Sequence, residues 1–231
     1  IDVRQPRLSW RIESDEQNVI QTAYHILIAS SPELLEQGKG DIWDSGKIES
    51  DASQWITYQG KTLKCNASYY WKVKIDTNKG ATNWSAPAFW TTGLFNEADW
   101  QGQWIGLDRA APGDSETQWS RLAARYLRKE FAVKKSVKRA TVHIAGMGLY
   151  ELFINGQRIG NQVLAPAPTD YRKTILYNTY DVTSLLQTEN AIGVTLGNGR
   201  FYTMRQNYKP YKIPTFGYPK LRLNLIVEYA D

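Results

Sequence analysis

The residues whose side chains are best suited to binding a ligand lie in the loops of the second half of the chain. Thr169–Arg172 follows a stretch stiffened by Pro166 and Pro168, Tyr177–Asp181 comes within a few residues, and Gly197–Tyr202 closes a later strand-like run. Tyr and Arg side chains on rigid loops can stack on the faces of sugar rings and hydrogen-bond to their hydroxyls. We therefore predict the following candidate carbohydrate-binding residues: Asp170, Tyr171, Arg172, Tyr177, Tyr180 and Asn198.

The same side chains also have a purely structural interpretation. Asp170 and Asp181 are typical of turn-capping positions, and Tyr171 and Tyr180 are suited to packing between sheets. Asp and Asn beside loop carbonyls also offer the oxygen ligands that Ca²⁺ uses, so calcium is a candidate cofactor although none is required. The metal ligands stay unassigned.

Catalytic signatures are missing from the sequence. His25 and His143 have no Cys or His partner in sequence reach, and the HxxxH, GxSxG and CxxC patterns are absent. The glycine pairs of Gly146–Gly148 and Gly197–Gly199 do not open a helix after a strand, which excludes a phosphate loop. Cys65 is the single cysteine, so an internal disulfide and a thiolate metal cluster are excluded. We assign no catalytic residue.

Composition excludes two further classes of partner. The net charge is +5, and the densest basic run, Arg128–Arg139, contains no nucleic-acid-binding motif and accompanies no basic helix. No apolar segment approaches the roughly 18 residues that a membrane span needs. The chain opens at Ile1 without an initiator Met or a signal peptide, so we expect it to be a piece of a longer protein.

Period-2 alternation of apolar and polar residues predicts an all-β protein. Over residues 1–93, strand-like runs and a short helix over Ser31–Gly38, capped by Ser31 and begun by Pro32, indicate an immunoglobulin-like sandwich. The run from Leu63 to Pro87 resembles the late strands of a fibronectin type III domain. The runs expected to be strands in this half are Leu8–Ile12, Gln21–Ser30, Tyr69–Ile75 and Trp84–Thr92.

Residues 94–103 break the alternation and are predicted to form a linker. From residue 104 to residue 231 the pattern indicates a second sandwich, of the jelly-roll kind. Asn155-Gly156 between two strand-like runs is the strongest short signal for a hairpin, and Thr183–Leu186 is suited to a single helical turn. The runs expected to be strands here are Tyr126–Val133, Ala140–Ala145, Tyr150–Ile154, Asn190–Leu196 and Lys220–Tyr229.

Ordered motifs along the chain resemble one enzyme family. The first half is similar to the N-terminal fibronectin-like domain of bacterial α-L-rhamnosidases of glycoside hydrolase family 78, and the second half resembles the β-sandwich module that follows it there. The first set of motifs is Pro6–Ile12, Gln21–Ile26, Trp43–Lys47 and Tyr69–Lys74, followed by Trp100–Gly106 at the junction and then by Leu127–Phe131. The second set is Tyr150–Gly160, Thr169–Tyr171, Tyr177–Thr183 and Leu196–Gly199.

The resemblance implies a parent enzyme that hydrolyses terminal α-L-rhamnosyl bonds of glycans or glycosides. In the family, the inverting pair of carboxylates lies in a downstream (α/α)₆ barrel, and this chain ends at Asp231 before any helical repeat. We therefore expect a non-catalytic N-terminal fragment, truncated within its second sandwich. Its implied roles are to support the downstream catalytic domain and to help recognise a rhamnose-containing glycan.

The resemblance also bears on ligands and location. Some relatives' sandwich modules bind rhamnose with calcium, but no ligand position can be matched residue by residue. Ala167-Pro168 stands where relatives often have Gly-Trp, which removes a stacking surface. The resemblance favours a bacterial source and a periplasmic or secreted location.

Two alternatives stay open. The aromatic and acidic loops would also suit a stand-alone carbohydrate-binding module, and the fibronectin-like half alone would suit a structural, adhesion-type pair of domains.

Overall fold

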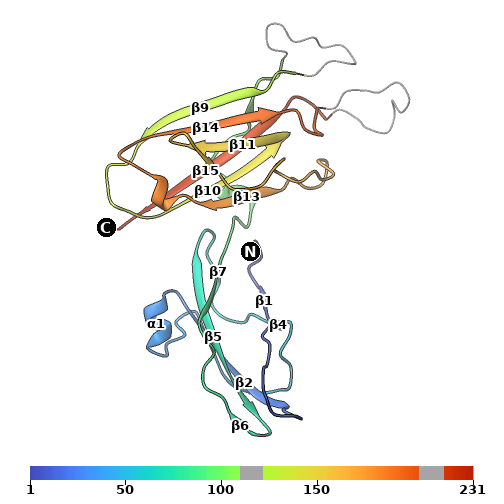
Figure 1. Ribbon diagram of the computed structural model, residues 1–231, viewed down its shortest axis with the longest axis vertical. Coiled ribbons are helices and arrows are strands. Elements are labelled where there is room, and N and C mark those ends of the chain that lie inside the picture. Colours follow the sequence, from blue (N-terminus) through green and yellow to red (C-terminus); the bar gives the residue numbers. More distant parts are fainter. Residues whose placement is uncertain (110–121, 203–215, 231) are drawn as a thin grey trace, which may run out of the picture. The chain divides into compact units, whose positions relative to one another are not determined.

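The computed structural model describes residues 1–109, 122–202 and 216–230 (Figure 1). The chain divides into two compact units, Ile1–Asp99 and Trp100–Asp231, so the division falls within the segment predicted as a linker. Antiparallel strands are the main regular secondary structure of both units in the described residues. The all-β class predicted from the sequence is confirmed.

The first unit is built around one sheet of five strands. Strand β2 (Gln21–Ala29) lies between β3 (Trp43–Glu49) and β5 (Ser68–Thr77), and β5 also pairs with β6 (Gly80–Ala81) and β7 (Ala88–Thr91). A separate two-stranded sheet pairs β1 (Arg7–Leu8) with β4 (Ile56–Thr57). The short 3₁₀ turn η1 (Glu97–Asp99) ends the unit.

Alternation along β2 explains why both faces of this sheet are covered. Ile26 and Ile28 are fully buried in the main core with residues of β5, whereas Leu27 and Ala29 pack on the other face against Leu35 of helix α1 (Pro32–Glu36). The helix follows its predicted signals: the Ser31 hydroxyl accepts a hydrogen bond from the Leu34 amide at 3.3 Å, and Pro32 is the first helical residue.

The second unit is a β-sandwich of two four-stranded sheets. One sheet has the order β13-β10-β15-β8 and the other has the order β12-β11-β14-β9. Their bounds are β8 (Ile105–Gly106), β9 (Arg125–Ala132), β10 (Val137–Met147), β11 (Leu149–Ile154), β12 (Gln157–Ile159), β13 (Tyr177–Asp181), β14 (Glu189–Gly197) and β15 (Lys220–Tyr229). The 3₁₀ turn η2 (Thr183–Leu185) follows β13.

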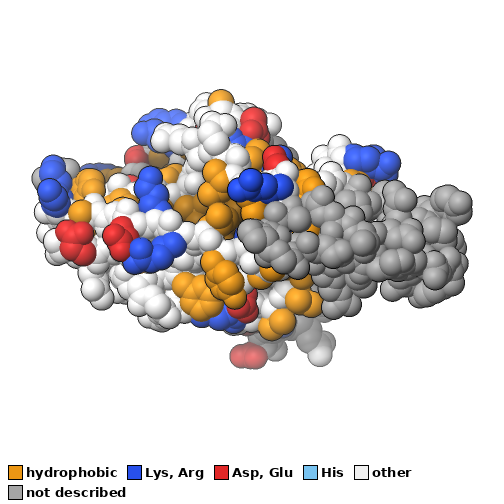
Figure 2. Space-filling view, turned by 90° about the horizontal axis from the view of Figure 1, so that it is seen from above, with side chains coloured by type: hydrophobic (Ala, Val, Ile, Leu, Met, Phe, Trp, Pro, Cys, Tyr) orange, Lys and Arg blue, Asp and Glu red, His pale blue; other side chains and the backbone are white. Residues whose placement is uncertain are grey.

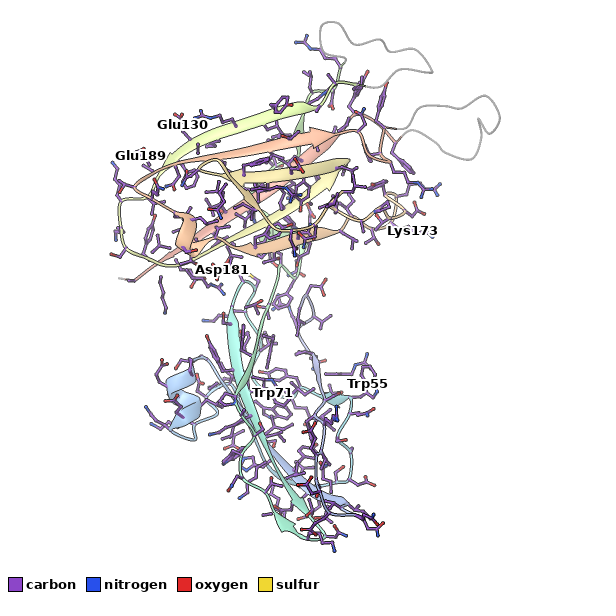
Figure 3. All side chains as sticks on the ribbon, viewed as in Figure 1. Trp55, Trp71, Glu130, Lys173, Asp181 and Glu189 are labelled. Atoms are coloured by element: carbon purple, nitrogen blue, oxygen red, sulfur yellow. The ribbon has the colours of Figure 1, made fainter. Side chains whose placement is uncertain are left out.

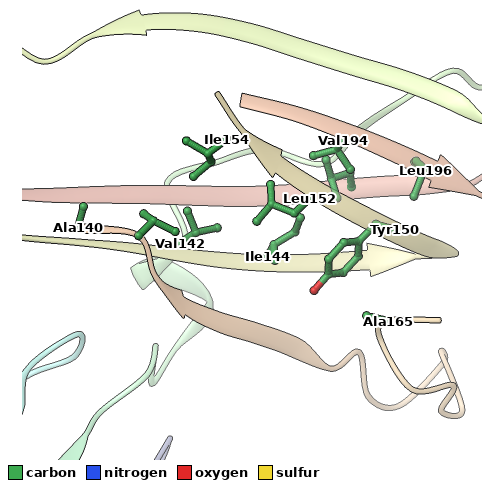
Figure 4. Packing of buried hydrophobic residues seen from close by; sticks show 11 residues of the cluster. Ala140, Val142, Ile144, Tyr150, Leu152, Ile154, Ala165, Val194 and Leu196 are labelled. Atoms are coloured by element: carbon green, nitrogen blue, oxygen red, sulfur yellow. The ribbon is translucent and has the colours of Figure 1, made fainter. Parts of the chain in front are cut away.

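The core of the second unit lies between these two sheets (Figure 4). Alternate residues of β10 point inward from one sheet and alternate residues of β11 and β14 point inward from the other, as the period of a strand requires. The buried residues are Ala140, Val142, Ile144, Tyr150, Leu152, Ile154, Ala165, Val182, Val194, Leu196 and Leu221.

The predicted hairpin joins β11 to β12. Asn155 and Gly156 have φ of +52° and +83°, the left-handed pair that a two-residue type I′ turn requires. The Asn155 side chain also leaves the turn: its Nδ2 donates to the Leu185 carbonyl and to Asn190 Oδ1, both at 3.0 Å, and its Oδ1 accepts from the Ala191 amide at 2.8 Å. This turn therefore ties together three segments of the unit.

The outer face of β15 carries buried polar residues that hold the chain segment entering the unit. Arg222 Nε donates to the Gly102 carbonyl at 2.6 Å, and Asn224 Oδ1 accepts from the amides of Gln101 and Gly102 at 3.2 and 2.8 Å. A Cβ at Gly102 would lie 2.3 Å from the Leu223 carbonyl oxygen, so only glycine fits there. Residues 100–102 are thus part of the second unit.

Candidate functional site

Asp170 and Arg172 form a self-contained turn. Arg172 Nε and Nη2 donate to the Asp170 carboxylate at 3.0 and 3.3 Å, and the Asp170 carbonyl accepts from the amides of Lys173 and Thr174. The Arg172 guanidinium holds the pKa of the Asp170 carboxyl below its usual value. The geometry is that of the turn-capping interpretation, with both side chains at the surface.

Tyr171 points away from this exposed pair into a cluster of rings. Its ring meets Phe201 and Phe216 edge-on, with centroids 5.2 and 5.5 Å apart. Its hydroxyl oxygen is buried without a hydrogen-bond partner in the described part of the chain, and burial raises the pKa of the phenol. Tyr171 therefore packs against other rings. The structural interpretation placed it between the two sheets, but it is not among the residues of that core.

Asn198 lies at the start of the loop that contains Phe201. Its Nδ2 donates to the Leu122 carbonyl at 2.9 Å, and its backbone carbonyl accepts from the Tyr202 amide at 3.2 Å. Its Oδ1 is buried and has no partner among the described residues. The side chain thus fixes the loop with one of its two polar atoms.

Tyr177 and Tyr180 contact different parts of the second unit. Tyr177 lies edge-on to Trp100 and His143, at 5.6 and 5.9 Å between centroids. Tyr180 packs against the sandwich core, and its hydroxyl donates to Gln162 Oε1 at 2.9 Å. Tyr180 therefore packs against the core between the sheets, as the structural interpretation predicted.

The six predicted residues therefore do not converge on one site. Lys173, beside the Asp170 turn, and Asp181, at the end of β13, lie far apart in Figure 3. Asp181 Oδ1 accepts from the Thr183 amide and hydroxyl at 2.9 and 2.6 Å, which is the predicted capping role. A direct role of the six residues in sugar binding stays a prediction.

An open hollow in the second unit was not foreseen from the sequence. Its volume is about 450 Å³, within the range of small-molecule sites. Among the described residues, its lining comes from four separate segments: Trp104, Asp108, Met147, Phe201, Phe216, Gly217, Tyr218 and Lys220. Lys220 Nζ lies 3.2 Å from Asp108 Oδ2 at the hollow. The density of aromatic residues was the available signal, but only the fold brings these residues together.

Tyr171 and Asn198 connect the predicted residues to this hollow. Tyr171 packs on Phe201 and Phe216, which line the hollow. Asn198 begins the loop that contains Phe201 and anchors it by donating to the Leu122 carbonyl. Two of the six predicted residues thus stand behind the lining without forming part of it.

No metal site is evident in residues 1–109, 122–202 and 216–230, where no three His, Cys, Asp or Glu side chains gather in a way that could hold an ion. The Asp170 carboxylate is already occupied by Arg172. Calcium binding stays a prediction.

Two further observations concern the surface. No helix in the described part of the chain has the length and apolar character to cross a membrane. Figure 2 shows basic and acidic side chains scattered among hydrophobic ones on the face in view, and the basic side chains visible there do not gather into one patch.

The fold defines a class: an immunoglobulin-like domain followed by a second β-sandwich. Residues 1–96 match the family model described as "Rha78A-like, N-terminal immunoglobulin domain", and residues 135–231 match "Alpha-L-rhamnosidase N-terminal domain". The chain belongs to the α-L-rhamnosidase family and corresponds to its N-terminal region. The resemblance seen in the sequence is confirmed.

Individual relatives agree with this assignment. An α-L-rhamnosidase of Formosa agariphila is 37% identical over the whole chain, and one of Alteromonas sp. is 36% identical over 84% of it. The solved α-L-rhamnosidase structures from Dictyoglumus thermophilum and Aspergillus terreus are 39% and 31% identical, each with a TM-score of 0.85 over the full chain. The chain spans 26% of the Formosa relative, 21% of the Alteromonas relative and 26% of each solved chain.

Proposed function

We propose that this chain is the non-catalytic N-terminal part of an enzyme that hydrolyses terminal α-L-rhamnosyl bonds of glycans or glycosides. One observation carries the proposal: the whole chain aligns with α-L-rhamnosidases, yet it covers only about a quarter of their length. Its role is to support the downstream catalytic domain, which supplies the acid and the base of the reaction.

The side chains of the predicted loops support a non-catalytic role. An inverting glycosidase needs one carboxyl group to protonate the leaving oxygen and a second, across the sugar ring, to activate water. Asp170 is paired with Arg172 and Asp181 caps its own turn, so these two carboxylates are engaged in local structure.

The test compares three proteins: this chain, the longer protein that contains it and the downstream catalytic domain, and the downstream part alone. Each is assayed for hydrolysis of an aryl α-L-rhamnopyranoside. We expect activity in the longer protein, none in this chain, and a lower melting temperature for the downstream part without its N-terminal units. Hydrolysis by this chain alone would refute the proposal.

A further inference from the structure

The outer face of the two-stranded sheet of β1 and β4, in the first unit, carries an exposed tryptophan. Leu8 and Ile56 pair across this sheet and pack into the core of the unit. Because side chains alternate along a strand, the next pair, Arg7 and Thr57, is exposed on the opposite face. Trp55 comes directly before β4 and lies beside these strands with 67% of its surface exposed (Figure 3). Packing in the core therefore does not account for this ring.

Two neighbouring side chains hold Trp55 in an unusual backbone conformation. Its φ is +59°, in the left-handed region that a bulky residue rarely adopts. Its amide donates to the Ser9 hydroxyl at 3.1 Å, and the Arg7 guanidinium lies over its ring, 5.0 Å from the centroid. Strained residues of this kind gather at sites that clamp ligands, so the conformation of Trp55 indicates a functional position.

Arg7 is the charged group of this surface. Among residues 1–109, 122–202 and 216–230, no acidic side chain forms an ion pair with it. A guanidinium presents its N–H donors in its own plane, so one that lies over a ring can still bind a carboxylate through two parallel hydrogen bonds. Ser9 and Thr57 add exposed hydroxyls beside it. The surface thus combines a flat apolar ring, an accessible cation and two neutral polar groups.

We propose that this surface, the Arg7–Trp55 platform, binds a pyranose ring that carries a carboxylate, that is, a uronate unit of an acidic polysaccharide. The C–H face of the sugar would pack on the exposed part of the indole, and its carboxylate would accept hydrogen bonds from Arg7. Its hydroxyls would bond to Ser9 and Thr57. The platform holds the polymer and performs no step of its hydrolysis. This proposal rests on residues of the first unit alone and is independent of the proposed function.

A pair of ligands that differ only in charge tests the role of the carboxylate. Titration of this chain by calorimetry should give saturable binding of trigalacturonate, with a Kd in the millimolar range. The same trimer with its carboxylates methyl-esterified should bind about tenfold more weakly, because it offers Arg7 no anion. Absence of saturation by about 50 mM trigalacturonate, or equal affinity for the two trimers, would overturn the proposal.

A third ligand tests the role of the sugar ring. A capped peptide of three glutamates carries the same charges as trigalacturonate but has no ring to pack on Trp55. It should bind about tenfold more weakly than trigalacturonate. Equal binding of the peptide would show a cationic surface that recognises any polyanion, which contradicts a uronate site.

Substitutions locate the site. Trp55→Gly removes the ring and suits the left-handed backbone, so it should abolish measurable binding without lowering the melting temperature. Arg7→Gln should weaken trigalacturonate binding about tenfold and remove the preference for the free acid over its ester. Phe89→Ala removes another ring of the same unit, which is 69% exposed, and as the matched control should leave the Kd unchanged. Unchanged affinity in Trp55→Gly and Arg7→Gln would refute this site.

The two proposals can fail separately. If the longer protein hydrolyses rhamnosides but this chain binds no trigalacturonate, only the Arg7–Trp55 platform is wrong. If this chain binds trigalacturonate through Arg7 and Trp55 but the longer protein hydrolyses no rhamnoside, the platform stands and the proposed function fails.

Discussion

His143 is a fully buried imidazole in the middle of β10. Its Nδ1 lies 2.9 Å from the hydroxyl oxygen of Thr179 on the neighbouring strand β13. Burial, reinforced by the positive charge of Arg139, lowers the pKa of His143 to about 4. The ring is therefore neutral in the folded protein at neutral pH and acts as a packed, hydrogen-bonding side chain.

This residue makes the stability of the second unit depend on pH. The pKa is about 6.5 in the unfolded chain and about 4 in the folded one, so the unfolded state binds the proton first as the pH falls. The free energy of unfolding is therefore highest above pH 6.5, where His143 is neutral in both states, and it decreases as the pH falls toward 4. From pH 7 to pH 5 the loss should be about 2 kcal/mol.

Urea unfolding at pH 7 and pH 5 measures this loss. His143→Gln should remove most of the difference between the two pH values, whatever it does to the stability itself. His25→Gln is the control, because His25 is partly exposed in the other unit. Equal pH dependence in the wild type and His143→Gln would contradict this role for His143.

At the residue scale, the sequence predicted interactions between residues close in the chain better than contacts between distant segments. The pairing of Asp170 with Arg172 is local, so the turn-capping alternative was accessible from the sequence. The contacts of Tyr171 with Phe201 and Phe216 join segments that only the folded sandwich brings together. The hollow was missed for the same reason, because the described residues that line it come from four separate parts of the chain.

At the scale of elements, the β11–β12 hairpin gives a sharp prediction. Gly156→Ala strains one left-handed residue and should cost about 1 kcal/mol of unfolding free energy. Asn155→Gly keeps the left-handed conformation accessible but removes hydrogen bonds to Leu185, Asn190 and Ala191, so it should cost more, about 2–3 kcal/mol. Chemical denaturation of the two variants decides the order. If Asn155→Gly lowers the free energy of unfolding less than Gly156→Ala does, the hydrogen bonds of the Asn155 side chain to Leu185, Asn190 and Ala191 contribute little to stability.

Elements with strong local sequence signals were predictable, whereas the pairing of strands within the sheets was not. The alternation along β2 and β5, the Ser31 cap and the Asn155-Gly156 turn each depend on neighbouring residues, and each was found from the sequence. The pairing of β10 with β15 depends on contacts across most of the unit. The short strands β1, β4 and β8 have too few residues for a period to show.

At the scale of the whole molecule, each unit has its own core. Ile26 is fully buried in the first unit and Leu152 is 1% exposed in the second. We therefore expect two calorimetric unfolding transitions. Ile26→Ala should lower only one of them and Leu152→Ala only the other, each by the equivalent of about 2–5 kcal/mol. A single transition that both substitutions shift equally would show that the units unfold together.

The binding of residues 100–102 by Arg222 and Asn224 has a practical consequence for dissecting the protein. A second domain excised from residue 104 onward, where the strand pattern resumes, would lose the carbonyl and amides that these two side chains bind across the outer face of β15. It would also lose Trp100, whose ring lies under the Arg222 guanidinium at 5.1 Å. A cut between Asp99 and Trp100 keeps all of these contacts, so it is the place at which to separate the two units or to fuse either one to another protein.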